Sequence, residues 1–312
     1  MEKRQQRQKR RKKLLAIRTV ISVIICIIIS AFIFMTLKEN NLIFPTAKSK
    51  QEASSSTNHT TTTSPTMRND NASDNNHDNE INWVKQTSEV SMPILMYHAI
   101  HVMAAEEASN ANLIVDPTTF ESHIQRLAEE GYYFLTPEEA YKVLTENVLP
   151  NGNHKIVWLT FDDSLWDFYD NAYPILHKYR AKATNNVITS TVGNSGNLSL
   201  DEMLEMKANG MFFQNHTVTH PDLSTSDEGT QVAEMKNSKN YLDTNLNQDT
   251  IAIAYPTGRY SDTTLTIATT LNYKLGVTTN EGIATASNGL LSLNRVRILP
   301  TTTADSLLAS IS

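Results

Sequence analysis

The sequence predicts an α/β protein whose parallel sheet closes, or nearly closes, into a barrel. From Met92 onward, short apolar segments with strand character alternate with segments that carry helix-start signals and helical periodicity. About seven such units fit into the roughly 220 residues that follow, and strands that alternate with helices form parallel sheets. No G-x-G-x-x-G or G-x-x-x-x-G-K-[ST] sequence is present, so an open nucleotide-binding sheet has no support.

The amino-terminal residues have the pattern of a membrane anchor. Residues 1–18 hold nine Lys or Arg and one Glu, and residues 19–37 carry no charge. A helix of that length is about enough to cross a hydrocarbon core of roughly 30 Å. The basic arm predicts a cytoplasmic amino terminus, with the rest of the chain outside the cell membrane. A cleaved signal peptide is the alternative, but the apolar run lacks a small-residue cleavage site.

The next segment, residues 38–90, is predicted to be a flexible polar linker. It is rich in Ser, Thr, Asn and Asp and poor in apolar residues, so it cannot offset the entropy of ordering. The only cysteine, Cys26, lies in the apolar run, so no internal disulfide can form. The chain has a net charge of −6 despite its basic arm, which argues against a nucleic-acid partner.

Local signals place the elements of the predicted domain, residues 91–312. Asp116-Pro117 and Thr136-Pro137 each combine an N-cap residue with a first-turn proline, and Ser199 caps a helix that ends at Gly210. Further helices are expected near 173–179, 227–246 and 262–272 and at the carboxyl terminus. Strands are expected at 93–97, 156–161, 183–188, 211–214, 251–255, 274–278 and 293–299.

Two adjacent carboxylates, Asp162 and Asp163, directly follow the apolar strand 156–161. Burying an ionised carboxylate is costly unless it is paired or bound to a metal. In β/α barrels, functional residues gather at the carboxyl ends of the strands, where this pair is expected. The pair therefore predicts a functional site rather than a packing role.

Two histidines, His216 and His220, follow the predicted strand 211–214 and belong to the same rim. Two imidazoles and one carboxylate are a common ligand set for catalytic zinc. The H-x-x-x-H spacing alone is weak, because zinc peptidases use H-E-x-x-H on a helix. Locally hydrogen-bonded loop histidines are the alternative, but the Asp pair at an earlier strand end favours a metal.

These motifs together resemble the polysaccharide deacetylase family, also called carbohydrate esterase family 4 or the NodB homology domain, over residues 92 to about 300. The family's T-F-D-D-G appears as Thr160–Ser164, its H-[ST]-x-x-H as His216–His220, and its R-x-P-Y-G in altered form as Ala254–Gly258. Pro93–His98 is similar to the opening strand of the extracellular branch that acts on poly-N-acetylglucosamine. The resemblance implies a distorted (β/α)7 barrel that binds a divalent metal.

The resemblance also implies roles for the matching residues. Asp162 would be the general base, and Asp163, His216 and His220 would bind the metal. The family usually holds zinc, with cobalt or nickel as further possibilities. The metal would polarise the acetamide carbonyl and lower the pKa of its water.

Further roles follow from the third motif and the first strand. The Thr257 N–H would help to hold the oxyanion, and Tyr255 and Pro256 would contact the substrate. His98 would protonate the leaving amine, with a packed strand-end histidine as the alternative. Trp166 could stack on a sugar ring.

The chain departs from the family pattern at several positions. Ser164 replaces a glycine and would be strained if that position needs a positive φ. Ala254 replaces the arginine that usually orients the catalytic aspartate, and Arg295 or Arg297 of the last strand could supply that charge. No clear fourth motif and no histidine in the final strand are present. The remaining histidines of the domain match no motif and are predicted to lie on the surface; they are His101, His123, His154 and His177.

The leading functional hypothesis is a membrane-anchored, metal-dependent hydrolase. It would remove N-acetyl groups from a cell-surface polysaccharide that contains N-acetylglucosamine, either peptidoglycan or poly-N-acetylglucosamine. One alternative is an O-acetyl ester hydrolase acting on a polysaccharide. The other, motivated by Ser164 and Ala254, is a weakly active glycan-binding or adhesion module on a stalk.

Overall fold

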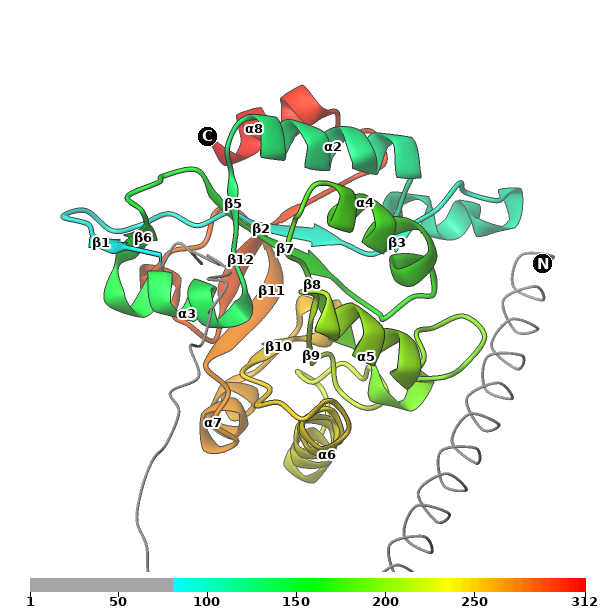
Figure 1. The fold of residues 1–312 in the computed structure, drawn as a ribbon. Coiled ribbons are helices and arrows are strands. Elements are labelled where there is room, and N and C mark those ends of the chain that lie inside the picture. The colour runs from blue at the N-terminus through cyan, green and yellow to red at the C-terminus, as the bar shows by residue number, and fades with distance from the viewer. Residues whose placement is uncertain (1–80) are drawn as a thin grey trace, which may run out of the picture. The chain divides into compact units, whose positions relative to one another are not determined.

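The computed structural model describes residues 81–312, whose central feature is a closed ring of seven parallel strands (Figure 1). The order around the ring is β2, β12, β11, β10, β9, β8 and β7, and pairing of β7 with β2 closes it. The strands are β2 (Ile94–Tyr97), β7 (Ile156–Phe161), β8 (Thr184–Val187), β9 (Phe212–Asn215), β10 (Ala252–Ala254), β11 (Leu275–Glu281) and β12 (Leu293–Arg297). The predicted closed barrel is therefore confirmed.

The ring is irregular, as the resemblance implied. β9 and β10 pair at a single register position, Asn215 with Ile253. The register between β11 and β12 shifts between Val277 and Glu281. A short strand, β5 (Tyr133–Phe134), pairs with the first residues of β7 and lies outside the ring.

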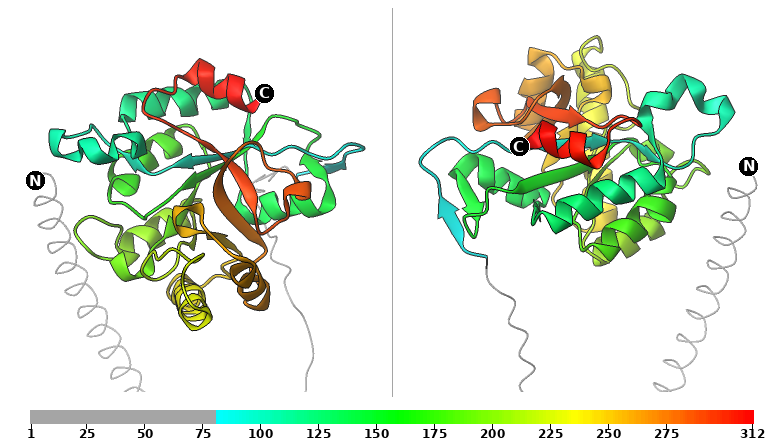
Figure 2. Two further views of the ribbon diagram at one scale, coloured as in Figure 1. Left: turned by 180° about the vertical axis from the view of Figure 1, so that it is seen from behind. Right: turned by 90° about the horizontal axis from the view of Figure 1, so that it is seen from above.

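The α-helices of the described part cover the outside of the ring, as Figures 1 and 2 show from three directions. Three of them begin at the predicted caps: the Asp116 side chain accepts a hydrogen bond from the Thr118 N–H at 2.8 Å, and Thr136 and Ser199 each form a capping box. The helices are α2 (Pro117–Glu129), α3 (Pro137–Glu146), α4 (Tyr173–Lys178), α5 (Leu200–Ala208), α6 (Glu228–Leu246), α7 (Asp262–Thr270) and α8 (Ala304–Ile311).

Side-chain alternation along β7 divides the core into two layers. Val157, Leu159 and Phe161 point outward and pack under the helices. Ile156 and Trp158 point into the barrel, where the Trp158 indole N–H donates to the Thr184 hydroxyl at 2.8 Å. If this alternation continues, the next inward-facing positions are Thr160 and Asp162, at the carboxyl-terminal rim of the barrel.

A loop that the sequence patterns did not predict follows β2 at this rim. β3 (Ala99–Ile100) pairs in parallel with β4 (Ile114–Val115), and the 3₁₀ helix η1 (Ala105–Leu113) lies between them. A single turn of π-helix, η2 (Phe168–Ala172), precedes α4. Both segments lack the apolar periodicity that reveals longer elements.

The predicted linker extends too far towards the domain. β1 (Trp83–Lys85) pairs antiparallel with β6 (Val148–Pro150), so these residues belong to the fold. The Lys142 ammonium also lies 5.7 Å from the centre of the Trp83 ring. Backbone pairing and this contact hold a segment whose composition alone indicates a linker.

The predicted anchor and basic arm lie outside the described residues. Within residues 81–312, none of the helices combines the length and apolar character that crossing a membrane requires. The predictions for 1–18, 19–37 and most of the linker remain predictions.

The histidines outside the motifs do not all lie on the surface. His154 and His177 are exposed, as predicted. His123 is fully buried, because it lies on the apolar face of α2. Its ring contacts the Tyr97 hydroxyl at 3.2 Å and the Thr302 carbonyl oxygen at 2.8 Å.

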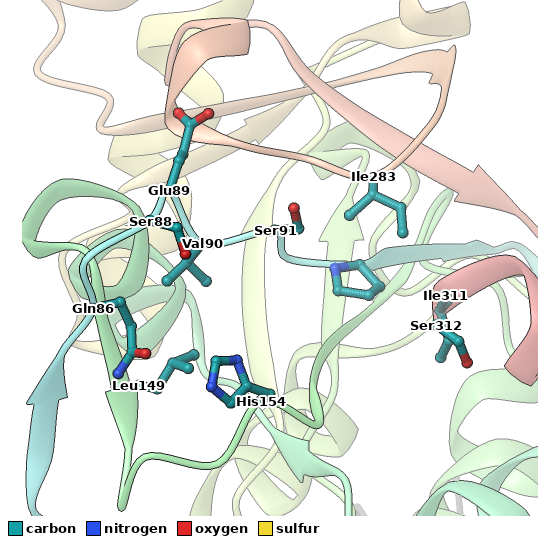
Figure 3. Close-up of a pocket in the computed structure, with 11 residues that line it drawn as sticks. Gln86, Ser88, Glu89, Val90, Ser91, Leu149, His154, Ile283, Ile311 and Ser312 are labelled. Atoms are coloured by element: carbon teal, nitrogen blue, oxygen red, sulfur yellow. The ribbon is translucent and has the colours of Figure 1, made fainter.

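A cavity of about 370 Å³ opens beside the amino-terminal ends of β2 and β7 (Figure 3). Its lining combines apolar side chains, such as Val90 and Leu149, with Glu89 and His154. Pro93, which precedes β2, also lines it. The cavity therefore lies at the end of the strands opposite to the candidate functional residues.

Candidate active site and metal centre

Inward-facing positions at the carboxyl ends of five strands converge on the candidate site. His98 follows β2, Asp162 follows β7, and His216 follows β9, while Asn186 and Ala254 lie near the ends of β8 and β10. Because side chains alternate along a strand, each of these residues points to the same side as the residues of its strand that face the barrel interior. The site is thus assembled by the closure of the barrel rather than by one local motif.

Asp163, His216 and His220 form a cluster that could hold a metal ion. One ligand atom from each residue lies within 4.8 Å of the other two. The Asp163 Oδ1 atom lies 3.4 Å from His216 Nε2 and 3.8 Å from His220 Nε2. Two imidazoles and one carboxylate suit a divalent transition metal and leave room for water or substrate.

The orientation of His216 supports this interpretation. Its Nδ1 atom lies 2.7 Å from the Ala254 carbonyl oxygen, to which it donates in the tautomer that leaves Nε2 free. A backbone carbonyl on the far ring nitrogen is the usual partner of a metal-binding histidine. Nε2 is then the atom that faces Asp163.

Asp162, the other carboxylate, is held by a buried arginine. Arg295 donates from Nη1 to Asp162 Oδ1 at 3.0 Å and from Nη2 to Oδ2 at 2.8 Å. Asn186 donates to Oδ1 at 2.8 Å. Burial alone would raise the pKa of Asp162, but the charge and hydrogen bonds of Arg295 outweigh it and hold the pKa well below its usual range.

Arg295 rather than Arg297 makes this contact. Arg295 is fully buried, and its Nε–H also donates to the Thr278 carbonyl oxygen at 2.7 Å. Its Nη1 atom lies 3.2 Å from the Thr160 hydroxyl oxygen. With these acceptors the guanidinium is fixed against the Asp162 carboxylate.

His98 also lies close to Asp162. Its Nε2 atom lies 3.9 Å from Asp162 Oδ2, and its side chain is 15% exposed. Burial lowers the pKa of His98 below its usual value, and the charge of Asp162 opposes this only in part. His98 is therefore neutral near pH 7 in this arrangement.

The third motif forms a tight turn beside these residues. Thr257 has a left-handed backbone with φ 56°. At Gly258, with φ +75°, an added Cβ would lie 2.1 Å from the Thr279 hydroxyl oxygen, so only glycine fits. Close packing of this turn against Thr279 thus fixes the position of the Thr257 backbone.

The side chains of Tyr255 and Pro256 are buried, so their contact with substrate stays a prediction. The Tyr255 hydroxyl donates to the Leu291 carbonyl oxygen at 2.9 Å, and its ring packs on Tyr260 with centroids 5.1 Å apart. Tyr255 directly follows Ala254, the last residue of β10, and successive side chains point to opposite faces of a strand. The Tyr255 side chain therefore points away from the rim. Its role in the structure is to anchor the turn.

Comparisons with known proteins identify the family of the chain. The polysaccharide deacetylase family profile matches residues 150–276. YxkH of Bacillus subtilis is 38% identical over 218 residues, covering 70% of this chain and 75% of that protein. The poly-β-1,6-N-acetyl-D-glucosamine N-deacetylase of Staphylococcus aureus is 31% identical over 201 residues, covering 60% and 68% respectively.

The chain belongs to the polysaccharide deacetylase family. The resemblance seen in the motifs is therefore confirmed, and the protein is a polysaccharide deacetylase, a hydrolase. The structure of the deacetylase PplD of Streptococcus pyogenes in complex with acetate is also similar. Its sequence is 62% identical, its TM-score is 0.70, and the match covers 72% of this chain and 100% of that one.

The serine that departs from the first family motif is strained. Ser164 has φ 48°, in the left-handed region that favours glycine. Its hydroxyl is buried and has no hydrogen-bond partner among the described residues. Its carbonyl oxygen accepts from the Leu198 N–H at 2.8 Å, which holds the backbone in place.

A glutamate that no sequence motif revealed holds the histidine loop. Thr217 and His220 have φ values of 65° and 63°. Glu234 of α6 accepts from the backbone N–H groups of Val218 and Thr219, each at 2.8 Å, and from the Thr219 hydroxyl at 2.7 Å. Only the contact between α6 and the loop identifies Glu234, because it lies 14 residues after His220 on a separate helix.

Ser164→Gly should stabilise the protein. Glycine removes the strain of the left-handed conformation and a buried hydroxyl without a partner, so we expect a gain of about 1 kcal/mol in the free energy of unfolding. Thermal unfolding of the full-length chain should show a midpoint about 2–4 °C higher. Ser310→Gly, within α8, should instead lower the midpoint. An unchanged or lower midpoint for Ser164→Gly would contradict the strain argument.

Glu234→Gln should weaken metal binding. The amide keeps the shape of the carboxylate but loses its charge and one acceptor, so the loop that carries His220 should be held less firmly. We expect zinc affinity to fall about tenfold, measured by competition with a chromophoric chelator. The matched control is Glu228→Gln, an exposed glutamate in the first turn of the same helix. Equal affinities in the two variants would show that Glu234 does not support the site.

Proposed function

We propose that the protein removes N-acetyl groups from a cell-surface polysaccharide that contains N-acetylglucosamine, either peptidoglycan or poly-N-acetylglucosamine. The observation that carries this proposal is that the two adjacent carboxylates have different partners. Asp162 is paired with Arg295, whereas Asp163 faces His216 and His220. The Staphylococcus aureus relative, which is named as an N-deacetylase of poly-β-1,6-N-acetyl-D-glucosamine, supports this class of substrate.

In this proposal Asp162 is the general base. A base must be ionised and must point at the proton it removes. The Arg295 pair serves both needs, because it keeps Asp162 as a carboxylate and fixes its plane. Arg295 thus takes the orienting role that the family's third motif usually gives to an arginine, whose position is Ala254 here.

Asp163, His216 and His220 would hold the divalent cation, for which zinc is our choice. Their mixed nitrogen and oxygen donors suit zinc, and cobalt or nickel can occupy similar sites. When bound, such a cation polarises the acetyl carbonyl and makes its water more acidic.

His98 and Thr257 would complete the reaction. Neutral His98 lies 3.9 Å from Asp162, so it can receive the proton that Asp162 takes from water and deliver it to the leaving amine. The Thr257 N–H, placed by its strained turn, would donate to the oxyanion. Trp166, three residues after Asp163, would stack on a sugar ring.

The two alternatives use the same site differently. O-acetyl ester hydrolysis needs the same base and ligands, so only a comparison of substrates separates it from deacetylation. A weakly active glycan-binding module was suggested by Ala254, but the Arg295–Asp162 pair supplies the charge that Ala254 lacks. This pair favours an active enzyme.

We further propose that residues 19–37 anchor the protein in the cell membrane as a single-pass helix, with the catalytic domain outside the cell. The uncharged run, the basic arm before it and the polar linker after it support this placement. A linker of about 50 residues would let the domain sample a layer of roughly 40 Å around the membrane.

Acetate release by the full-length chain tests the proposed function. Metal-stripped protein should release acetate from chitooligosaccharides or peptidoglycan only after zinc, cobalt or nickel is restored. Asp162→Asn should lower this rate at least about a hundredfold, because the amide cannot accept the proton.

Asp305→Asn is the matched control, because this aspartate is 84% exposed on α8 and should have no effect on the rate. Faster acetate release from acetylxylan than from the N-acetylated substrates would favour the esterase. Glycan binding without release at any metal loading would favour the binding module.

A further inference from the structure

His101 lies between two carboxylates outside the metal cluster. Its Nδ1 atom is 2.5 Å from Asp167 Oδ2, and its Nε2 atom is 3.2 Å from Glu107 Oε2. Ionised carboxylates only accept hydrogen bonds, so both ring nitrogens must carry a proton. This geometry favours the imidazolium, and the prediction of a surface histidine is wrong, since the side chain is only 13% exposed.

The contact joins two segments that border the site. Asp167 is fully buried and follows the metal-ligand aspartate by four residues. Glu107 belongs to η1 and also accepts from the Ala104 N–H at 2.9 Å. His101 therefore ties the loop after β3 to the chain after β7.

The imidazolium also stacks on Trp166. The two ring centroids are 5.9 Å apart and the planes are inclined by 25°. A cation over an indole face gains electrostatic attraction in addition to packing. The Trp166 backbone is fixed independently, because its N–H donates to the Gly196 carbonyl oxygen at 3.0 Å.

The same segment connects to the metal centre. Asn197, next to Gly196, donates to the Asp163 carbonyl oxygen at 3.0 Å. Two apolar side chains, Val102 and Met103, directly follow His101 and are 74% and 46% exposed. An indole and the exposed apolar side chains that follow its stacking partner in the chain suit the apolar face of a sugar ring.

We propose that His101 is a positioning residue that holds Trp166, with Val102 and Met103, as a sugar-stacking platform beside the metal centre. The inference rests on the proposed function, because it assigns a site for the N-acetylglucosamine polymer. His101 acts through Trp166 and does not touch the reacting atoms.

The platform should depend on pH. The hydrogen bond to Asp167 raises the pKa of His101 above its usual value, and burial opposes this only in part. The charged groups that face His101 are Asp167 from the chain after β7 and Glu107 from η1. The cation is present below the raised pKa and is lost as the pH rises through it. One ring nitrogen would then present a lone pair to a carboxylate, and the loop should loosen.

Substitutions of His101 test this inference in the full-length, zinc-loaded chain. His101→Gln should raise KM for chitooligosaccharides about tenfold and leave kcat within about twofold, since only the platform is disturbed. Trp166→Ala should have the same effect, and the double variant should be no worse than either single one. Zinc affinity should not change.

His101→Arg is the discriminating variant. A guanidinium can stack on Trp166 and pair with both carboxylates, and it does not titrate below about pH 12. It should restore KM and remove the rise in KM that we expect of the parent as the pH rises through the raised pKa of His101. A KM that is unchanged in His101→Gln, or a pH dependence that persists in His101→Arg, would overturn the inference.

Calorimetric binding of the same chitooligosaccharide separates this inference from the proposed function. If the parent binds but releases no acetate, the deacetylase proposal fails, and weaker binding by His101→Gln still supports the platform. If acetate is released with the same KM in parent and variant, only the platform inference fails. If the parent neither binds nor releases acetate, both fail.

Discussion

The structure depends on how two neighbouring anions are neutralised at the end of one buried strand. Asp162 and Asp163 follow β7 without a break, and both lie among strands that close around them. The Arg295 guanidinium compensates Asp162 from β12, on the far side of the β2 strand. Asp163 instead faces the imidazoles of His216 and His220, and a cation bound there would balance its charge. Closure of the ring is what brings these partners within reach.

The Arg295–Asp162 pair is better understood as a positioning device than as a source of net stability. The free energy needed to remove two charged groups from water is roughly equal to the energy of their electrostatic attraction. Such pairs therefore add little to the free energy of folding. Removing one partner, however, leaves the other buried and uncompensated, which is strongly destabilising. The pair therefore fixes the plane and the ionisation of Asp162 at the carboxyl-terminal rim.

The backbone around the site is strained in several places. Left-handed conformations occur at Asp163, Ser164, Thr217, His220 and Thr257. Such conformations cost of order 1–3 kcal/mol each and persist only where the surroundings enforce them. Asn197, Glu234 and the close contact at Gly258 provide that support. Metal ligands held in this way need little rearrangement to bind.

Much of the fold and the site could be predicted from sequence, because the relevant signals are local. Helix caps such as Ser199 and the apolar run of β7 need no tertiary information. The Asp pair and the two histidines are recognisable because each follows a strand. The burial of the Tyr255 side chain could not be predicted in this way, because motif membership does not reveal which face of the strand a side chain occupies.

Other features depended on contacts between distant segments. Sequence predicted Arg295, with Arg297 as the alternative, because only the folded structure decides which one contacts Asp162. His101 carries no motif, and its two carboxylates come from separate loops. Glu234 lies on a helix whose sequence signals only its own beginning and end. The roles of these residues can be identified only from the folded structure.

The measurement that tests the central claim most directly is the zinc affinity of the metal-stripped full-length chain, compared with Asp162→Asn and Asp163→Asn. If the two carboxylates are divided as described, Asp163→Asn should weaken zinc binding by about a hundredfold or more, since it removes a ligand. Asp162→Asn should stay within about threefold of the parent. Equal losses in both variants, or a larger loss in Asp162→Asn, would contradict this division of roles.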